Sequence, residues 1–415
     1  MFTRIRIFAW IGLVGIACVM GFSGVLASDE DRQGQSEQAS RGQQSPSAVS
    51  DDTSNPAEPS GDSDVDLPDY EQMVSRAIRY LATRGQAADG SFSRFSGPGV
   101  TALVTTGILR HGRTPDDPVV ARALAYLEQF VQPDGGIYRE TTVFRNYETC
   151  LAMLCFVEAN QDGRYDELLE RADAFVKGIQ WGEQHGVDPS DFAYGGAGYG
   201  KHERPDLSNT SFLIEALRAV GNDENSEAIQ RALIFVSRSQ NLESEHNTTP
   251  FATKNEDGGF YYTPAAGGSS QAGETPAGGL RSYGSMTYAG LKSMIYAGVG
   301  PDDPRVQAAV SWIEKHYDLS SNPGMGDAGL YYYYHTFAKA LDAMGYDQFV
   351  DQHGNRHDWR EELRMELARR QHPEGFWANS NERWLEGDGN LSTGYALLAL
   401  AYCKPSSSSD DDRHD

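Results

Sequence analysis

The stretch Arg204 to Gly221, RPDLSNTSFLIEALRAVG, places four short polar side chains directly before an apolar helix. Asp206, Ser208, Asn209 and Thr210 are residue types that cap helix N-termini, because they accept hydrogen bonds from free backbone N–H groups. At the mouth of a cavity, Asp206 could instead act as a catalytic acid, with Asn209 and Thr210 binding a ligand. Both interpretations stay open from the residues alone.

The densest aromatic run is Tyr331 to Tyr334, and His335 follows it. Tyrosine and histidine can stabilise a cation through a ring face, bind a sugar or transfer a proton. Core packing with a satisfied histidine is the competing interpretation. If the segment lines a cavity, we expect Tyr334 and His335 to be catalytic and Tyr333 to bind the ligand.

Further candidates stand just before two other apolar helices: Arg281 with Tyr283, and Tyr147 with Glu148. Helix N-termini carry partial positive charge, so several converging N-termini with Arg281 beside them would favour an anionic ligand. A surface role for Arg281 and ordinary helix-start charge for Glu148 are the competing interpretations. The sequence has no Gly-rich phosphate loop, Cys/His cluster or Gly-x-Ser-x-Gly elbow, so we expect no metal and no cofactor.

The elements that must position these candidates form a repeat from Asp69 to Cys403. Each unit has an amphipathic helix, a Gly-rich turn with an acid and an aromatic, and a more apolar helix that a threonine opens. The turns read ADGSF, PDGGIY, SDFAYGG, EDGGFYY, GDAGLYYYY and PEGFW. The threonines are Thr101, Thr149, Thr210, Thr287, Thr336 and Thr393. Helices with one apolar stripe belong outside, and helices apolar all round belong inside.

Six such hairpins can stack as an open solenoid or close into a ring. An open stack needs polar capping repeats, which neither the first unit, Tyr70 to Gly112, nor the last, Trp359 to Tyr402, provides. We therefore predict an all-α fold, a closed (α/α)6 toroid of six helical hairpins over residues 69–403. Closure would gather the inner-helix N-termini around one central cavity, with Asp206, Tyr283 and His335 at its rim.

With these repeats the chain resembles the terpenoid cyclase/protein prenyltransferase superfamily, the prenyltransferase/squalene oxidase repeat proteins. Its turns are similar to the Gln-x-x-Asp-Gly-x-aromatic motif of the cyclases, best kept in Gln86 to Phe92 and Gln132 to Tyr138, with Gln371 to Trp377 as a variant. The resemblance covers residues 69–403. It implies the toroid fold and an isoprenoid or other apolar ligand in the cavity.

Two functional motifs of that superfamily are incomplete here. Squalene and class II diterpene cyclases protonate their substrate with the middle aspartate of Asp-x-Asp-Asp-Thr, and Ser208 stands in that position. The zinc site of the prenyltransferase β subunits would keep only His335, because Arg281 and Tyr283 stand where Asp and Cys would be. The resemblance therefore implies a cyclase-like protein without the usual acid or zinc ligands, and leaves open whether it is an enzyme.

Three functions remain open: a protein that holds an apolar ligand, an extracytoplasmic glycan- or peptide-processing enzyme with a Tyr/His/carboxylate site, and a non-catalytic interaction scaffold. A dry aromatic cavity with one acid would favour the first, an open polar groove the second, and a centre filled by side chains the third. We expect an apolar small molecule or a glycan in the central cavity of a monomer. The flexible stretch 264–279 is a candidate lid over its mouth.

The two ends of the chain lie outside the repeats. Arg4 and Arg6 precede an uncharged run, residues 7–27, which predicts a signal peptide over residues 1–27 or an uncleaved anchor. Residues 28–68 and 404–415 are polar and acidic, which predicts a disordered linker and a disordered tail. The net charge of −24 argues against nucleic acid as a partner. We expect export to the periplasm, cell surface or medium, with membrane association only through residues 7–27.

Overall fold

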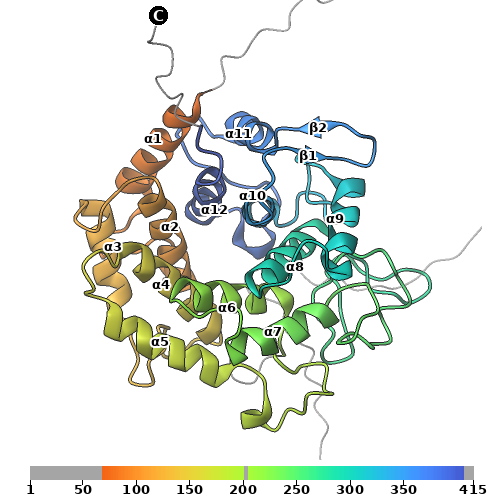
Figure 1. Cartoon of the computed structure of the whole chain (residues 1–415). Helices are drawn as coiled ribbons and strands as arrows, with labels where there is room; N and C mark the ends of the chain where they lie inside the picture. The colour runs from red at the N-terminus through yellow and green to blue at the C-terminus, as the bar shows by residue number, and fades with distance from the viewer. Residues whose placement is uncertain (1–67, 201–203, 406–415) are drawn as a thin grey trace, which may run out of the picture. The chain divides into compact units, whose positions relative to one another are not determined.

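The computed structural model describes residues 68–200 and 204–405, and this part of the chain is helical (Figure 1). The predicted signal peptide, nearly all of the linker and most of the tail lie outside the described residues. The all-α prediction is confirmed, apart from a short antiparallel hairpin of β1 (Phe349–Val350) and β2 (Arg356–His357). No helix in the described ranges combines the length and apolarity needed to cross a membrane.

The odd-numbered helices carry one buried stripe each, as Tyr70, Met73 and Ala77 do in the first of them. Their bounds are α1 Tyr70–Tyr80, α3 Pro118–Glu128, α5 Asp166–Ile179, α7 Glu227–Arg238, α9 Pro304–His316 and α11 Trp359–Arg370. The even-numbered helices are buried nearly all round. Their bounds are α2 Pro98–Arg110, α4 Arg145–Ala159, α6 Leu207–Ala219, α8 Gly284–Tyr296, α10 Leu330–Ala343 and α12 Gly389–Leu400.

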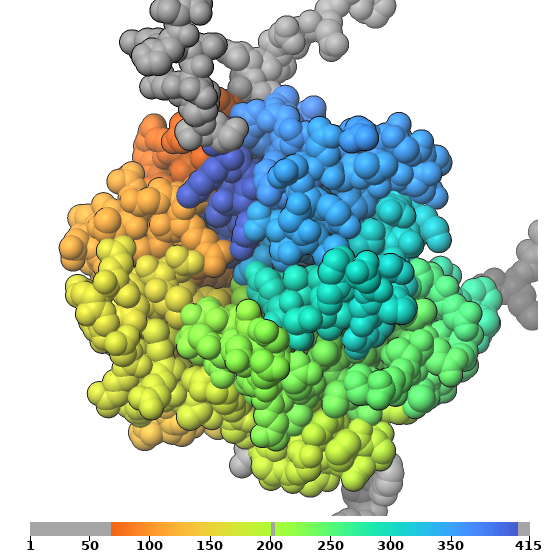
Figure 2. Space-filling view, viewed as in Figure 1, coloured from red at the N-terminus to blue at the C-terminus, as the bar shows by residue number. Residues whose placement is uncertain are grey.

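The even-numbered helices form the inner layer (Figure 1). Each contacts the next in chain order from α2 to α12, and α12 also contacts α2. The odd-numbered helices pack on the outside of these inner helices, as α3 does on α2 and α5 on α4. Figure 2 shows the first and last repeats, orange and blue, side by side. The row of inner helices therefore returns to its start.

The repeated threonines join each turn to its inner helix. In five repeats the threonine hydroxyl accepts a hydrogen bond from a backbone N–H of the turn, since a buried N–H needs an acceptor. The pairs are Thr101 with Phe92 (2.9 Å), Thr149 with Ile137 (3.0 Å), Thr210 with Ala197 (2.9 Å), Thr287 with Phe260 (3.1 Å) and Thr393 with Trp377 (3.0 Å). Thr336 differs, because its hydroxyl donates to the Tyr333 carbonyl within its own helix.

A turn glutamine joins the last repeat to the first. The Gln371 amide donates to the Gly375 carbonyl of its own turn and to the Met73 carbonyl in α1, both at 2.9 Å. Gly375 has φ +99°, and a Cβ there would lie 2.5 Å from the Arg76 carbonyl oxygen, so only glycine allows this close approach. The glutamine turns thus brace neighbouring repeats.

The threonine contact predicts a matched difference in stability. We expect Thr393→Val to lower the free energy of unfolding by about 1–3 kcal/mol, because it leaves the buried N–H of Trp377 without an acceptor. Thr336→Val should cost less, since its hydroxyl bonds only within α10. Urea denaturation measures both variants. Equal losses would show that the threonines do not secure the turns.

Candidate functional site

Four aromatic side chains meet inside the ring of inner helices, and we call them the aromatic circuit: Tyr147 of α4, Phe212 of α6, Tyr332 of α10 and Tyr395 of α12. The ring centroids lie 5.5 Å apart for Tyr147 and Phe212, 6.2 Å for Phe212 and Tyr332, and 5.7 Å for Tyr332 and Tyr395. The hydroxyl oxygens of Tyr395 and Tyr147 are 3.4 Å apart and complete the circuit. Tyr147 and Tyr332 remain partly exposed. The circuit therefore offers an aromatic surface near the start of the inner helices.

Asp206 lies beside this surface as the N-cap of α6, which confirms the cap interpretation. Its carboxyl accepts hydrogen bonds from the Asn209 backbone N–H (2.9 Å), the Ser208 hydroxyl (2.7 Å) and the Asn209 amide (2.8 Å), and a further one from Tyr262. Burial raises the pKa of Asp206, and these donors oppose that rise. Thr210, the next predicted ligand-binding residue, is occupied as the turn threonine of its repeat. Asp206 and Asn209 are thus held by their own helix start.

Tyr283 comes close to Asp206, as predicted, but Arg281 does not join them. Tyr283 is buried at the N-cap of α8, and burial, followed by the Asp206 charge, holds its pKa well above the usual value. Arg281 is exposed, and its guanidinium donates to the Glu274 carbonyl at 3.0 Å. The expectation of Arg281 beside the helix N-termini is therefore wrong, because the long loop before α8 holds that side chain itself.

Tyr333 and Tyr334 also lie away from the aromatic circuit, contrary to the expectation that they line the cavity. The Tyr333 hydroxyl donates to the Asp318 carbonyl at 2.5 Å, and the Tyr334 hydroxyl donates to the Leu319 carbonyl at 2.7 Å. Successive helix residues point about 100° apart, so a run of tyrosines cannot face one way. Tyr332 is the cavity-side residue that sequence reasoning missed. Tyr332 stands three residues before His335 and seven before Lys339, a spacing that places all three on one face of the helix, and this could have identified it.

His335 lies on the same face of α10 as Tyr332. Its ring centroid is 5.8 Å from that of Tyr395, and only 2% of the residue is exposed. Burial, with the charges of Lys292 and Arg110, holds its pKa well below the usual value, so the ring is neutral. Its Nδ1 has no hydrogen-bond partner among the described residues. His335 therefore lies beside Tyr395 of the circuit and is not part of a hydrogen-bonded catalytic pair through Nδ1.

The largest feature that sequence reasoning missed is a buried group of three charged side chains, which we call the ion triad. Glu215 of α6 lies between Lys292 of α8, at 2.8 Å, and Lys339 of α10, whose amine donates to the other carboxylate oxygen. The three side chains are 2–5% exposed. Glu215 and Lys292 each stand five residues after the repeat threonine, Thr210 or Thr287. A charged residue five positions after the threonine, inside an apolar helix, could have indicated a buried ion pair.

Side chains fill the centre of the ring next to the ion triad. The cavity there measures about 10 Å³, which is room for about one water molecule. It is lined by Leu103, Thr106, Arg110, Leu151, Leu154, Phe212, Glu215, His335 and Leu398. Ligand pockets usually measure about 300–1,000 Å³. A ligand of ordinary size therefore does not fit inside this core.

Glu148 follows Tyr147 but turns away to hold the preceding loop. Its carboxyl accepts hydrogen bonds from the Arg139 backbone N–H at 3.0 Å and the Thr142 hydroxyl at 3.1 Å. Burial raises the pKa of Glu148 to about 7, although both hydrogen bonds oppose the rise. Its place is that of a loop anchor, while Tyr147 alone belongs to the aromatic circuit.

The raised pKa of Glu148 predicts a pH effect on stability. The folded state keeps a proton up to about pH 7 that the unfolded chain, with its usual pKa of 4.5, releases earlier. Stability should therefore fall as pH rises from about 4.5 to 7, by about 2–3 kcal/mol from this group. Glu148→Gln should lose that part of the pH dependence. Urea titrations of both proteins at pH 5 and pH 8 test this, and parallel profiles would contradict it.

The long loop before α8, residues 263–282, reaches over to a distant repeat. The Ser269 hydroxyl accepts a hydrogen bond from Arg204 at 3.0 Å, and Arg204 lies over the Tyr262 ring at 5.5 Å. The Gln271 side chain accepts one from Arg383 at 2.5 Å. Arg383 begins the short 3-10 helix η4, Arg383–Leu385, which precedes α12. The loop of the fourth repeat thus connects to the sixth on the side where the inner helices begin.

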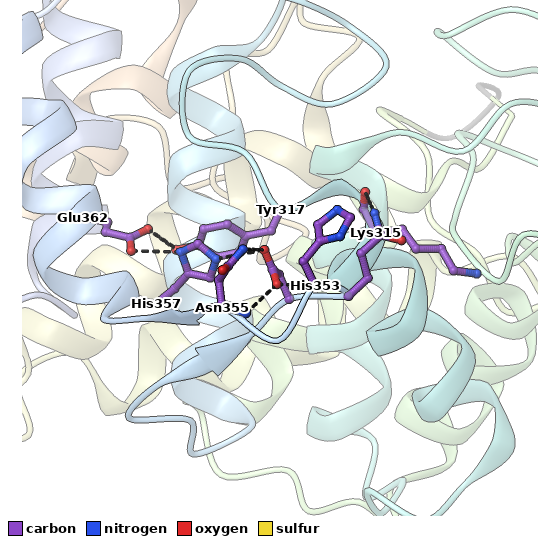
Figure 3. A network of polar contacts seen from close by, with 8 residues as sticks. Lys315, Tyr317, His353, Asn355, His357 and Glu362 are labelled. Carbon is purple, nitrogen blue, oxygen red and sulfur yellow. Dashed lines mark hydrogen bonds and ion pairs between the residues drawn. The ribbon is translucent and has the colours of Figure 1, made fainter.

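A second polar network lies at the β1–β2 hairpin (Figure 3). His357 contacts Glu362 through Nδ1 at 2.9 Å and Asp351 through Nε2 at 3.4 Å. Tyr317 stacks on His357 at 4.1 Å and donates its hydroxyl to Glu362 at 2.8 Å. Both imidazole nitrogens face carboxylates, so neither is free for a substrate. The network fastens the hairpin to α11 and the end of α9.

The comparisons with known proteins agree with this fold. The profile of the squalene-hopene cyclase C-terminal domain matches residues 94–263. Over these residues the chain is similar to the terpenoid cyclase superfamily. No curated protein sequence matches the chain significantly. Within the described ranges, no group of three or more His, Cys, Asp or Glu side chains is arranged to hold a metal ion.

Two solved structures show similar chain courses at low identity. The type II terpene cyclase MstE from Scytonema, in its apo form, is 12% identical, with a TM-score of 0.46 over 80% of this chain and 98% of its own. A polysaccharide lyase is 8% identical, with a TM-score of 0.47 over 80% and 96%. A substituted MstE in complex with geranylgeranyl dihydroxybenzoate has a TM-score of 0.30 at 12% identity, covering 80% and 97%. At these scores the likenesses carry no argument about function.

Proposed function

We propose that the protein is an exported, terpene-cyclase-like closed toroid of six hairpins that binds an isoprenoid or other apolar ligand on the aromatic circuit. The circuit itself carries the proposal, because four rings from four inner helices form one apolar surface that is partly exposed. Burial raises the pKa values of Tyr147, Tyr332 and Tyr395, so their hydroxyls are neutral. Uncharged aromatic rings give large contact areas to apolar groups.

The proposed activity is binding, without protonation of the ligand by Asp206. The Asp206 carboxyl accepts hydrogen bonds from its own helix start and from Tyr262, and the middle position of the cyclase motif is Ser208. An acid that reacts must keep a proton directed at the substrate. The aromatic circuit can therefore hold a ligand while the neighbouring carboxyl serves the fold.

Substitution of Asp206 tests whether this residue serves as a helix cap or as a catalytic acid. We expect Asp206→Asn to keep stability and ligand binding, because an asparagine side chain also caps helices. After a rotation of the Asn209 side-chain amide, the new amide group can donate to its Oδ1, which has no partner in the wild type. Asp206→Ala should lose about 1–2 kcal/mol of stability. Denaturation and product analysis with geranylgeraniol test both variants. An isoprenoid turnover present in the wild type and lost in Asp206→Asn would restore the acid.

The function is tested on the full chain with its natural N-terminus. We expect N-terminal sequencing of the exported protein to begin after Ala27. Mass spectrometry of a denatured sample should detect an isoprenoid or another lipid that was bound to the protein.

Calorimetric titration then compares two probes, farnesol and maltotriose. Binding of farnesol alone supports the proposal. Binding of maltotriose alone would assign the site to glycans instead.

The filled centre of the ring favours one competing function, a non-catalytic interaction scaffold. Only about 10 Å³ is free beside Glu215, and a scaffold needs no internal cavity. In that case neither probe binds and no small molecule is released from the purified protein. The same measurements therefore separate the scaffold from the ligand-binding protein.

A further inference from the structure

The turn that precedes α12 combines exposure with an unfavourable backbone. Trp384 has φ +57° and Leu385 has φ +65°, the left-handed region that L-residues with large side chains rarely adopt. Trp384 is 39% exposed, whereas Trp359 and Trp377 are fully buried. Such a conformation persists only where the surroundings hold it, and it is often found at ligand clamps. We call residues 383–386 the Trp384 turn.

Contacts on three sides hold the Trp384 turn at the start of α10. The Glu386 carboxylate accepts a hydrogen bond from the Tyr332 backbone N–H at 2.8 Å. The Trp384 ring covers Gly329, where a Cβ would lie 3.0 Å from it. The Arg383 guanidinium lies 4.2 Å over the Trp384 ring and also donates to Gln271 of the long loop. The turn is thus fixed directly to the helix that carries Tyr332.

The Trp384 turn also lies near Tyr283 of α8. Arg383 is close enough to Tyr283 to lower the pKa of its hydroxyl, against the larger effects of burial and Asp206. The turn itself lies against the start of α10, which carries Tyr332 of the aromatic circuit. The exposed indole lies beside the start of α10 and, through Arg383, beside the long loop.

We infer that the Trp384 turn is the outer part of the ligand site: Trp384 packs on the bound apolar ligand, and the contact between Arg383 and Gln271 is the latch that opens to admit it. This inference rests on the proposed function. The left-handed backbone at Trp384 and Leu385 is strained, so release of the latch lets the turn relax to a less strained conformation. When a ligand is bound, its contact with the indole offsets the strain of the closed conformation.

Quenching of tryptophan fluorescence by acrylamide tests the contact. Farnesol should reduce the quenching of the full-length protein, because the ligand covers Trp384. Trp384→Phe should lose that farnesol-dependent change while remaining folded, since the side chain is exposed. Trp384→Ala should bind farnesol about tenfold more weakly by calorimetry. Phe95→Ala is the matched control, because Phe95 is also exposed, at 60%, and lies in the loop before α2.

The outcomes separate this inference from the function on which it rests. If calorimetry shows farnesol binding while the quenching and the Trp384→Ala affinity stay unchanged, the Trp384 turn is not part of the site and the proposed function stands. If Phe95→Ala weakens binding as much as Trp384→Ala, the effect is not specific to the turn and the inference is overturned. If calorimetry shows no farnesol binding to the wild type, both proposals fall together.

Discussion

Glu215→Leu is expected to destabilise the protein by about 3–5 kcal/mol, or to prevent folding, because it leaves two buried lysines without their shared carboxylate. Lys292 and Lys339 are 2–3% exposed, and both contact Glu215. Water cannot reach the ammonium groups to replace the lost partner. A charged ammonium group in a dry core is strongly unfavourable without such a partner. Urea or thermal denaturation of the variant measures the loss.

Replacing the whole ion triad is the matched control. Glu215→Leu together with Lys292→Met and Lys339→Met should be neutral or stabilising by about 1–4 kcal/mol, because apolar side chains of similar size avoid the desolvation of the three charges. Farnesol binding should survive in this triple variant, since none of the three replaced residues belongs to the aromatic circuit. A triple variant as unstable as Glu215→Leu would show that the charges themselves hold the helices together.

The charge balance of the triad explains why the single change is so costly. Burial lowers the pKa of Lys292 to about 7 and that of Lys339 well below its usual value. One carboxylate, that of Glu215, can neutralise only one ammonium group. We therefore expect burial to leave one of the two amines uncharged at neutral pH. Without Glu215 neither amine has a partner for its charged form.

Tyr332→Leu is expected to weaken farnesol binding by about tenfold or more, equivalent to about 1.4 kcal/mol, because it removes one ring of the aromatic circuit. Tyr334→Leu should leave the affinity unchanged. It should instead lower the unfolding free energy by about 1–3 kcal/mol, since it removes a buried ring and the hydrogen bond to the Leu319 carbonyl. Calorimetry and urea denaturation of both variants measure the two effects.

An affinity loss in Tyr332→Leu together with unchanged affinity in Tyr334→Leu would identify the side of α10 that faces the ligand. Both residues are tyrosines on one helix, so general damage to α10 would affect both affinities. A loss of farnesol binding in Tyr334→Leu with binding intact in Tyr332→Leu would reverse the assignment. Comparable affinity losses in both variants would trace the effect to the helix and not to the aromatic circuit.

Local patterns in the sequence were enough for the helices, their order and the cap of α6. Inner and outer helices differ in apolar periodicity, and that periodicity decides which side of a helix must be buried. The repeat threonines lie inside the inner helices, three to six residues after each helix begins and not at its first residue as expected, and Asp206 caps α6. These features depend on neighbours within a few residues, so a single sequence contains the information.

Contacts between distant residues were not predictable in this way. The Tyr331–Tyr334 run was compatible with any rotation of α10, and packing against the loop after α9 placed Tyr333 and Tyr334 there, with Tyr332 inward. Arg281 was expected at the helix N-termini, and this expectation failed because the position of its side chain depends on contacts within the long loop, such as that with the Glu274 carbonyl. Nothing in the local pattern distinguishes these outcomes.

The sequence by itself determined an all-α chain of repeated hairpins whose inner helices are apolar and carry a threonine in their first half. Only the tertiary structure decided which side chains meet inside the ring. Glu215 finds Lys292 and Lys339 across 77 and 124 residues, and Arg383 finds Gln271 across 112. Such pairs form because helix rotation and ring curvature bring distant positions together, and the free energy of that packing belongs to the whole core and not to any one segment.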